Sequence, residues 1–499
     1  MQPGLRGRLP RRAGVEADGA ADGRPLEDRA VTALATIPVM RLSATDLARL
    51  LGGALEGGAA TVVPLAGITT DSRDVIPGGA FVAVRGTAAD GHAFVADAAA
   101  RGAAVAVVAR GWQPANGAAP PLLLRVADPA AALRLACRRR LEELGCEVIG
   151  ITGSVGKTTT KDLCALAVAD RPVARTPGNL NTWTGVPLTV LRLDSPVERF
   201  VVELAMSAPG EIADLCSFVQ PRIGVLLNVG YAHVGLLGSI AAIADAKAEL
   251  LDALPADGAA CLNADDAEVV RVAGRSRAPL VWFGLHDRGA AIRAVDIEPD
   301  RMNGVRFTLQ TPAGRAPVRL RVPGEHAVLD ACAAAAVAWV LDVSIADAAE
   351  RLSTFEPAEH RGAVRIGPGG CIVYDDCYNS SPTSLAAALR VLAASGAATR
   401  VAVLGDMLEL GDLTEPAHVE AGRQAAAAAT HLVAVGDHAA TMVEAAIAAG
   451  MPPAHATIAD GADAAAQQVL PRCGDGTVVL VKASHSLALE RVVELLGAP

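Results

Sequence analysis

The residues with the clearest chemistry form a glycine-rich turn that ends in lysine and threonine. The turn reads Thr152-Gly153-Ser154-Val155-Gly156-Lys157-Thr158-Thr159 and directly follows an apolar, strand-like run. Backbone N–H groups of such a turn bind phosphate oxygens, the lysine contacts the terminal phosphates, and the first threonine hydroxyl ligates Mg²⁺. The first glycine of the general pattern falls on Ile151, so a chance Gly-Lys-Thr turn is the alternative. We predict ATP binding, because a strand precedes the turn and a helical pattern ending near Ala169 follows it.

Three later residues have side chains suited to a metal–phosphate site. Glu203 ends an apolar run, a position where a carboxylate commonly holds Mg²⁺ or orients a nucleophile. His233 also follows an apolar run and can ligate a second cation. Lys247 lies in a helical pattern. Each residue also has an interpretation without function: Glu203 as a surface charge at a strand end, His233 as a capped loop residue and Lys247 as a solvated lysine. Their order and spacing after the phosphate loop favour function.

The elements that position these residues alternate between strand and helix patterns. Strand-like runs cover 147–152, 199–204, 223–229 and 260–263 in the middle of the chain, and 371–376, 400–405, 432–436 and 477–482 near its end. This alternation is typical of mostly parallel sheets with helices on their faces. Runs at 80–84 and 103–108 predict a further small α/β unit. Between 291 and 322, a period-two pattern around Asn303-Gly304 predicts an antiparallel appendage.

We therefore expect an α/β fold of three domains. The boundaries place a small N-terminal α/β domain at 40–127, a central phosphate-loop ATPase domain with a mostly parallel sheet at 128–351, and a Rossmann-like domain at 352–499. Residues 1–39 have neither a signal-peptide core nor a transit-peptide composition. They are either a disordered extension or the result of a misassigned start upstream of Met40, where a helix capped by Ser43 or Thr45 begins.

Composition excludes several classes of protein. The 499 residues include 44 Lys and Arg against 54 Asp and Glu, without a dense basic cluster, which argues against binding to nucleic acid. The longest apolar stretch, 331–341, is about half of the ~20 residues that a membrane span needs. Nine dispersed cysteines without a Cys-x-x-Cys pair indicate reduced thiols. We expect a cytoplasmic protein without stable membrane insertion.

The chain resembles the Mur ligase family, the ATP-dependent amide-forming enzymes that build the peptidoglycan stem peptide. Its phosphate loop matches the family's, including the absent first glycine. The resemblance is greatest to the branch that adds a D-alanyl-D-alanine dipeptide, and Thr70-Asp71-Ser72-Arg73 resembles the uridine-nucleotide-binding domain. The segments that resemble this branch are Gly178-Asn179-Leu180-Asn181, Gly185-Val186-Pro187-Leu188, Pro209-Gly210-Glu211-Ile212, Asp375-Asp376-Cys377-Tyr378-Asn379-Ser380-Ser381-Pro382, Gly405-Asp406-Met407-Leu408-Glu409-Leu410-Gly411 and Val481-Lys482-Ala483-Ser484. The Asp-Asn-Pro-Arg motif of the branch that adds the third residue is absent.

The resemblance assigns roles to individual residues. The implied catalytic residues are Lys157, Glu203, His233, Lys247 and Arg361. The implied ATP contacts are Thr152, Gly153, Ser154, Val155, Gly156, Lys157, Thr158, Thr159, Asp330, Arg361 and Asp375, and the implied Mg²⁺ ligands are Thr158, Glu203, His233 and a carbamylated Lys247. The implied substrate contacts are Ser72, Arg73, Asn179 and Asn181, with Asp376, Tyr378 and Asn379 at the dipeptide end. Carbamylation would convert the lysine ammonium into a carboxylate-like metal ligand.

Three segments depart from the family pattern. His326-Ala327-Val328-Leu329-Asp330 stands where the family has His-Asn-x-x-Asn, Ala205 replaces a glycine, and Lys482-Ala483-Ser484-His485 replaces Lys-Gly-Ser-Arg. The Asp330 carboxylate still offers an acceptor for the exocyclic amine of adenine.

The implied function is a ligase of peptidoglycan synthesis, and hence of cell-wall biogenesis, cell shape and cell division. It would join D-alanyl-D-alanine to UDP-N-acetylmuramoyl-tripeptide through an acyl phosphate, using ATP and Mg²⁺ and forming ADP, as the final cytoplasmic step of the precursor pentapeptide. We expect a monomer. The alternatives are a sister Mur-type ligase with a different amino-acid or dipeptide substrate, such as D-alanyl-D-lactate, and a non-catalytic nucleotide-binding descendant.

Overall fold

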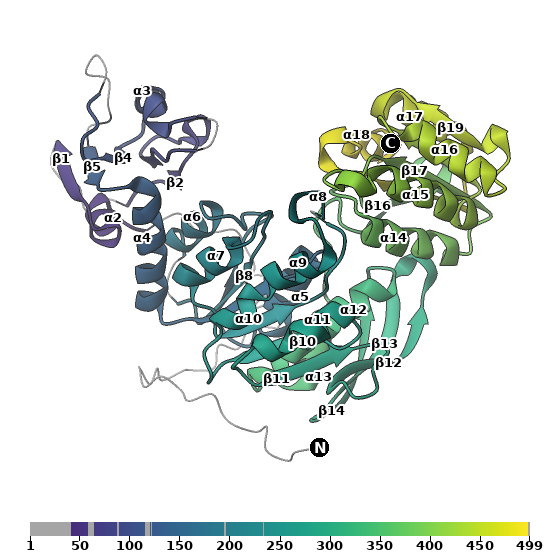
Figure 1. Cartoon of the computed structure of the whole chain (residues 1–499), viewed down its shortest axis with the longest axis horizontal. Helices are drawn as coiled ribbons and strands as arrows, with labels where there is room; N and C mark the ends of the chain where they lie inside the picture. The colour runs from purple at the N-terminus through teal and green to yellow at the C-terminus, as the bar shows by residue number, and fades with distance from the viewer. Residues whose placement is uncertain are drawn as a thin grey trace.

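The computed structural model describes residues 41–57, 64–86, 89–114, 120, 122–193, 196–232 and 234–497. Three sheets divide this part of the chain into three α/β units, with the N-terminal and C-terminal units at opposite ends of the central one (Figure 1). This confirms the expected three-domain α/β fold. The expectations for residues 1–39, for a start at Met40 and for His233 lie outside the described residues.

The N-terminal sheet has five strands in the order β1-β5-β4-β3-β2. These strands are β1 (Ala54–Gly57), β2 (Ile68–Thr69), β3 (Ala80–Val82), β4 (Val105–Ala109) and β5 (Leu122–Val126), and the helices are α2 (Ala44–Leu51) and α3 (Val95–Ala100). Among the described strands of this sheet, only the β1–β5 pair is antiparallel. The predicted cap of α2 is confirmed at Ser43, whose hydroxyl oxygen accepts a hydrogen bond from the Asp46 N–H at 3.1 Å.

The central sheet has nine strands in the order β14-β13-β12-β11-β10-β9-β6-β8-β7. The strands are β6 (Glu147–Thr152), β7 (Val173–Arg175), β8 (Arg199–Glu203), β9 (Ile223–Leu226), β10 (Ala259–Asn263), β11 (Leu280–Gly284), β12 (Ile292–Pro299), β13 (Val305–Thr311) and β14 (Gly314–Leu320). The helices are α4 (Pro129–Leu144), α5 (Lys157–Ala167), α6 (Gly185–Leu191), α7 (Glu211–Val219), α8 (Val234–Leu237), α9 (Ile240–Lys247), α10 (Glu249–Ala253), α11 (Ala267–Val272), α12 (Glu325–Val340) and α13 (Ile345–Leu352).

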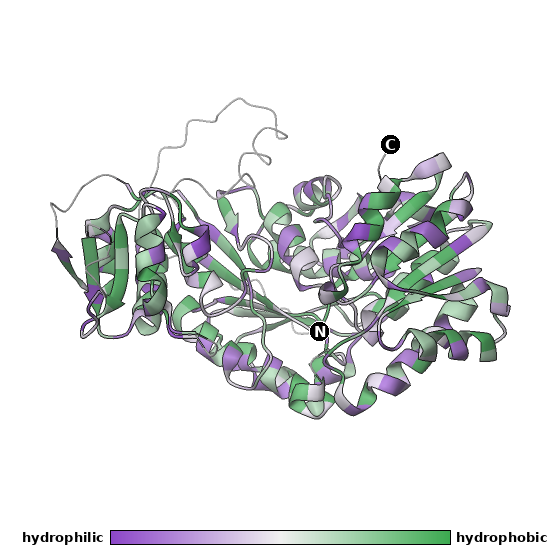
Figure 2. Cartoon of the chain, turned by 90° about the horizontal axis from the view of Figure 1, so that it is seen from above, coloured by the Kyte–Doolittle hydropathy of each residue, from purple (hydrophilic) through white to green (hydrophobic). Residues whose placement is uncertain are grey.

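Helices cover both faces of the parallel part of this sheet. On β6, Ile149 and Ile151 belong to the apolar cluster that contains α5, α12 and α13. Val148 points to the opposite face, in the cluster with α7 and α10. Every residue of β8 is buried, as parallel strands covered on both sides require. In Figure 2 the strands are accordingly among the most hydrophobic parts of the chain.

The predicted antiparallel segment is confirmed as β12, β13 and β14, but it is not a separate appendage. β12 pairs antiparallel with β13 and also continues the large sheet by parallel pairing with β11. The predicted turn residue Gly304 has φ +116°, and a Cβ there would lie 1.8 Å from the Leu320 carbonyl oxygen. Glycine is therefore required at this turn.

The C-terminal sheet has six strands in the order β15-β16-β20-β17-β18-β19, and only β15–β16 is antiparallel. The strands are β15 (Ala363–Ile366), β16 (Ile372–Asp375), β17 (Thr399–Gly405), β18 (His431–Val435), β19 (Ala456–Ala459) and β20 (Thr477–Lys482). The helices are α14 (Pro382–Ala394), α15 (Thr414–Ala428), α16 (Ala439–Ala448), α17 (Gly461–Val469) and α18 (Glu490–Gly497).

The central and C-terminal units touch where α8 meets the loop after β17. The Gly235 N–H donates to the Glu409 carbonyl oxygen at 3.0 Å. A Cβ on Gly235 would lie 2.5 Å from the backbone nitrogen of Gly411, so the two backbones meet without side chains between them. Figure 1 shows α8 at this junction.

No helix in the described part of the chain is both long and apolar enough to cross a membrane.

Candidate active site

The phosphate-loop motif forms a tight turn between β6 and α5. Gly156 has φ +84°, and a Cβ there would lie 2.6 Å from Asp330 Oδ1 on α12. Two independent constraints therefore require glycine at this position. The Lys157 ammonium donates to the carbonyl oxygens of Gly153 at 2.9 Å and Ser154 at 3.3 Å.

Asn228, which follows the neighbouring strand β9, braces the phosphate loop. Its Oδ1 accepts hydrogen bonds from the N–H groups of Ser154 at 3.1 Å and Val155 at 2.9 Å, and its Nδ2 donates to the Val155 carbonyl at 3.0 Å. The predicted strand over 223–229 ends at Leu226 because the following residues leave the sheet to make these contacts. Sequence reasoning missed this role, although the position of Asn228 directly after an apolar run was the available signal.

Lys247 reaches the same turn from α9. Its ammonium donates to the Gly153 carbonyl oxygen at 3.1 Å, so Lys157 and Lys247 share one acceptor. Burial lowers the pKa of Lys247 well below its ordinary value, and the nearby Lys157 charge adds to this effect. Burial also lowers the pKa of Lys157, while Glu203 opposes that shift. The buried amine of Lys247 and the half-buried amine of Lys157 thus lie against the phosphate loop.

Glu203 ends β8 beside the start of α5. Its Oε2 accepts from the Thr158 hydroxyl at 2.8 Å, and its Oε1 accepts from Asn181 Nδ2 at 2.8 Å. Glu203 is 3% exposed. Thr158, Asn181 and Glu203 therefore meet around one buried carboxylate. The hydroxyl of Thr158 and the carboxylate of Glu203 are oxygen ligands, which Mg²⁺ prefers.

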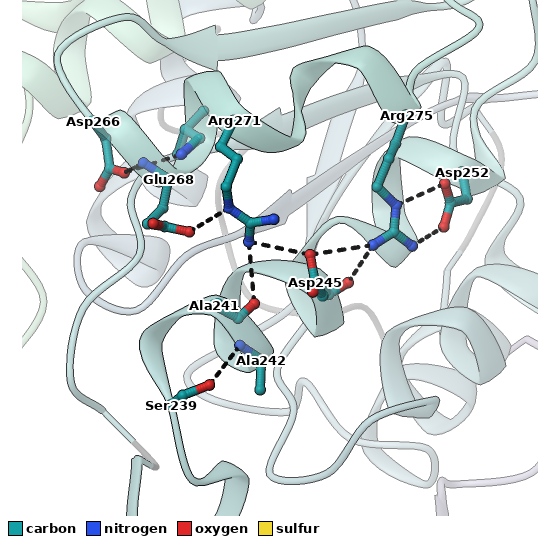
Figure 3. A network of polar contacts seen from close by, with 10 residues as sticks. Ser239, Ala241, Ala242, Asp245, Asp252, Asp266, Glu268, Arg271 and Arg275 are labelled. Atoms are coloured by element: carbon teal, nitrogen blue, oxygen red, sulfur yellow. Dashed lines mark hydrogen bonds and ion pairs between the residues drawn. The ribbon is translucent and has the colours of Figure 1, made fainter.

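The helix that carries Lys247 is held by packing and by a surface network. Ile243, Ala244 and Ala246 are buried on its inner face. On its outer face, Asp245 accepts from Arg271 Nη2 at 3.1 Å, and its carbonyl accepts from Arg275 Nη1 at 2.9 Å (Figure 3). Such half-exposed pairs contribute about 0–1 kcal/mol each, so the buried face contributes most of the stability of this helix position.

The buried lysine at position 161 was not predicted. Lys161 lies one helical turn after Lys157 on α5, is fully buried, and donates to the Gly178 carbonyl at 2.9 Å. Burial lowers its pKa, and the Asp162 charge opposes that shift. The i, i+4 spacing from Lys157 was the signal for a common helix face. Lys161 therefore ties Gly178, which directly precedes Asn179, to α5.

The C-terminal unit contributes Arg361. Its guanidinium carbon lies 3.8 Å from the centroid of the Tyr378 ring. The Tyr378 ring also stacks on the His485 ring, with 5.4 Å between the two centroids. The Arg361 charge contributes to the lowered pKa of Lys157, so it acts across the domain junction on the phosphate loop. The structure thus brings Arg361 and Tyr378 together.

The two acidic residues after β16 have different partners. Asp375 is fully buried and accepts from His360 Nδ1 at 3.0 Å. Asp376 forms an ion pair with the buried Lys482 at 2.6 Å, and Lys482 also donates to the Asn379 carbonyl at 2.9 Å. The Asp376–Asn379 segment is therefore anchored to the end of β20.

Other predicted residues lie apart from this cluster or beneath it. Ser72 and Arg73 lie in the N-terminal unit, where Arg73 pairs with Asp71 at 2.6 Å. The Asn179 side chain makes no hydrogen bond of its own among the described residues. Asp330 lies under the phosphate loop and is 5% exposed; burial raises its pKa well above the ordinary range.

The residues present fit a nucleoside triphosphate with a divalent cation. The loop is a glycine-rich turn between a strand and a helix N-terminus, and the ammonium groups of Lys157 and Lys247 lie against it. The Thr152 Oγ1 atom is buried without a hydrogen-bond partner among the described residues. An anion with several oxygens would satisfy both the positive charge and the unpaired hydroxyl.

Comparisons with known proteins show which family this chain is similar to. Three family models match the chain, "Mur ligase family, catalytic domain" at residues 64–141, "Mur ligase middle domain" at 151–338 and "Mur ligase, glutamate ligase domain" at 360–485. A Mycobacterium tuberculosis protein named UDP-N-acetylmuramoyl-tripeptide--D-alanyl-D-alanine ligase is 37% identical, and the match covers 92% of this chain and 98% of that protein.

Two solved structures are also similar. MurF from Acinetobacter baumannii superimposes with a TM-score of 0.81 at 31% identity, covering 92% of this chain and 99% of that one. MurF ligase from Thermotoga maritima in complex with ADP gives a TM-score of 0.75 at 27% identity, covering 86% of this chain and 97% of that one.

Proposed function

The chain belongs to the Mur ligase family, and within this family we propose that it joins D-alanyl-D-alanine to UDP-N-acetylmuramoyl-tripeptide while converting ATP to ADP. The observation that carries this function is the convergence of Lys157 and Lys247 on the Gly153 carbonyl, next to the Thr158–Glu203–Asn181 contacts. These groups form a binding site for the phosphates of a nucleotide.

The reaction must bring an anionic carboxylate to an anionic phosphate. Lys157 at the loop and Arg361 from the C-terminal unit both supply positive charge. This charge stabilises the phosphoryl group as it passes to the peptide carboxylate, forming an acyl phosphate. The dipeptide amine then attacks the acyl carbon and phosphate leaves. Enclosure between domains limits hydrolysis of the activated acyl group.

Thr158, Glu203, His233 and a carbamylated Lys247 are the proposed Mg²⁺ ligands, and bound Mg²⁺ would neutralise phosphate charge there. The structure around Lys247 supports the carbamate, since a depressed pKa leaves more of the neutral amine that reacts with CO₂. The remaining phosphate-loop residues, Thr152 to Thr159, are the proposed phosphate contacts. Asp330 and Asp375 stay proposed nucleotide contacts, and the position of Asp330 favours an effect through the loop backbone.

Substrate contacts are proposed at both ends of the molecule. Ser72 and Arg73 would bind the uridine nucleotide, and Asn179 and Asn181 the region near the reacting carboxylate. Asp376, Tyr378 and Asn379 would lie at the dipeptide end, a role supported by the Lys482 anchor. We further propose domain boundaries at 127/128 and 351/352, a monomer, and a cytoplasmic location.

A comparison of amines tests this function. Initial rates of phosphate release would be measured with UDP-N-acetylmuramoyl-tripeptide, Mg²⁺ and ATP, using D-alanyl-D-alanine, D-alanyl-D-lactate or single amino acids in turn. We expect the highest rate with D-alanyl-D-alanine and no release above background without an amine. A preference for another amine would indicate a sister ligase, and ATP binding without turnover would indicate a non-catalytic descendant.

A further inference from the structure

Three side chains with metal-ligating atoms meet in the C-terminal unit, outside the phosphate-loop site. They are His360, Asp375 and Cys377, and their ligand atoms all lie within 4.8 Å of one another. His360 Nδ1 lies 3.1 Å from Asp375 Oδ1, and the Cys377 Sγ lies 3.2 Å from the same oxygen. An imidazole nitrogen, a carboxylate oxygen and a sulfur therefore surround a single point.

Backbone contacts hold the two segments that carry these groups. The Tyr378 N–H donates to the His360 carbonyl at 3.0 Å, and the Gly362 N–H donates to the Asp375 carbonyl at 2.9 Å. His360 itself has φ +62°, an uncommon conformation for a residue with a side chain. The cluster is thus built by the fold and not by the chance approach of flexible side chains.

We propose that His360 Nδ1, Asp375 Oδ1 and Cys377 Sγ form a site for a zinc ion, with solvent as the fourth ligand. Nitrogen, sulfur and oxygen ligands suit zinc, whereas Mg²⁺ prefers oxygen alone. Metal–ligand distances of about 2.0–2.3 Å in a tetrahedral site separate ligand atoms by about 3.3–3.7 Å. The Asp375 Oδ1 separations of 3.1 Å from His360 Nδ1 and 3.2 Å from Cys377 Sγ therefore need to widen only slightly. On binding, the Cys377 S–H bond breaks, a zinc–sulfur bond forms, and the proton passes to water.

The surroundings of the cluster are compatible with a cation. Arg365 Nε lies 3.4 Å from Asp375 Oδ2, which leaves Oδ1 for the metal. The Cys377 thiolate, the Asp375 carboxylate and Glu359, whose Oε1 lies 3.9 Å from Arg365 Nη2, together balance the charges of zinc and Arg365. An open pocket of about 400 Å³ is lined by His360 of the cluster together with Glu359, Arg365 and Glu494, among other residues.

The thiol is protonated without a metal. Burial raises the pKa of Cys377, and the carboxylates of Asp375, Glu490 and Asp376 add to this shift. A free reactive thiolate is therefore not expected at this position, and the metal itself must displace the proton.

Zinc binding would also affect ligation, a consequence that rests on the proposed function. His360 directly precedes Arg361, and Asp375 is a proposed nucleotide contact. A metal bound to His360 would restrain the neighbouring Arg361, and the same metal would occupy Asp375 Oδ1. Neither residue would then be free to contact the nucleotide. We therefore expect zinc to lower the ligation rate.

Metal binding to the full chain tests the site without any activity measurement. Chelator-treated protein would be titrated with Co²⁺, whose bond to a thiolate gives a charge-transfer absorption band. We expect one equivalent of Co²⁺ to produce this band and Zn²⁺ to abolish it. Cys377→Ser should lose the band, and His360→Gln should weaken binding by at least about tenfold. Cys473→Ser, a half-buried cysteine of the same unit, is the matched control and should behave as the unmodified protein.

Absence of the band in the unmodified protein, or its retention in Cys377→Ser, would overturn the site. The two variants lie in different segments, so misfolding of one leaves the other as a test. In a parallel assay, zinc should slow ligation by the unmodified protein but not by Cys377→Ser; equal slowing of both would overturn the inhibitory effect while leaving the site intact. A chain without ligase activity would refute the proposed function, and the cobalt spectrum would still decide the metal site.

Discussion

Lys157 and Lys247 come from different helices and donate to the same atom, the carbonyl oxygen of Gly153, at 2.9 and 3.1 Å. The two ammonium groups therefore repel each other in a buried environment. This repulsion and the loss of solvation both favour a neutral Lys247. This arrangement suits the roles proposed for the two amines, phosphate binding by Lys157 and carbamylation of Lys247.

Lys247 should carry a carbamate whose occupancy depends on pH. Because burial depresses the pKa of Lys247, the neutral amine persists at a lower pH than for an exposed lysine. Occupancy should fall as pH drops through that depressed pKa, since the protonated amine does not react with CO₂. NMR spectra recorded with ¹³C-labelled bicarbonate would follow the carbamate signal. Lys247→Arg cannot be carbamylated, and we expect its ligation rate to fall by about 100-fold or more; unchanged turnover would contradict the role of the carbamate.

Glu203→Gln should weaken the metal site without unfolding the protein. The amide retains one acceptor for the two donors, Thr158 and Asn181, but removes the negative charge that a cation needs. We expect the Mg²⁺ concentration for half-maximal rate to rise about tenfold or more. Titration of activity with Mg²⁺ measures this shift, and circular dichroism checks the fold. Glu268→Gln, on the surface of α11, serves as a control that should leave the Mg²⁺ dependence unchanged.

Asn228→Ala should disorder the phosphate loop. It removes the acceptor for Ser154 and Val155 and the donor to Val155, at a cost of about 1–3 kcal/mol for buried groups left unpaired. We expect a higher KM for ATP with a smaller effect on the KM of the dipeptide. Asn228→Asp keeps the acceptor for the Ser154 and Val155 N–H groups but loses the donor to the Val155 carbonyl and places a negative charge beside the phosphates. It should therefore recover part of the stability and none of the ATP affinity. Equal KM values for all three proteins would refute the bracing role.

Gly156→Ala should be strongly destabilising. The left-handed conformation costs about 1–2 kcal/mol for a residue with a Cβ, and that Cβ would lie 2.6 Å from Asp330 Oδ1. Thermal unfolding would show a lowered Tm, whereas Gly274→Ala, which faces open space, should change it little. Adding Asp330→Ala to Gly156→Ala should recover part of the loss, because it removes the clash and leaves the backbone strain. Purely additive effects in this double-mutant cycle would show that the contact is unimportant.

Much of the fold was predictable from local pattern. The strands at 147–152 and 477–482 have the predicted bounds, and the helix after Ser43 begins at its predicted cap. These segments are predictable because an apolar run or a capping residue determines them locally. Short strands such as β7 and β19 were not predicted, since three or four residues carry too little periodicity to distinguish them from loops.

The residue types of the candidate site could be predicted from the sequence, but the contacts between these residues could not. Lys157 and Glu203 follow from the loop motif and from a strand end. The shared acceptor of Lys157 and Lys247, the brace from Asn228 and the contact of Asp330 with Gly156 are tertiary relationships between segments far apart in sequence. No pattern within one segment specifies them, because they depend on how β9, α9 and α12 pack around the loop.

The mass of the product formed from UDP-N-acetylmuramoyl-tripeptide, ATP, Mg²⁺ and D-alanyl-D-alanine tests the proposed ligation most directly. We predict a product heavier than the tripeptide by one dipeptide less one water, with one phosphate released for each product molecule and neither formed when the dipeptide is omitted. Phosphate released without any gain in mass, or no turnover from folded protein that still binds ATP, would contradict amide-bond formation at this site.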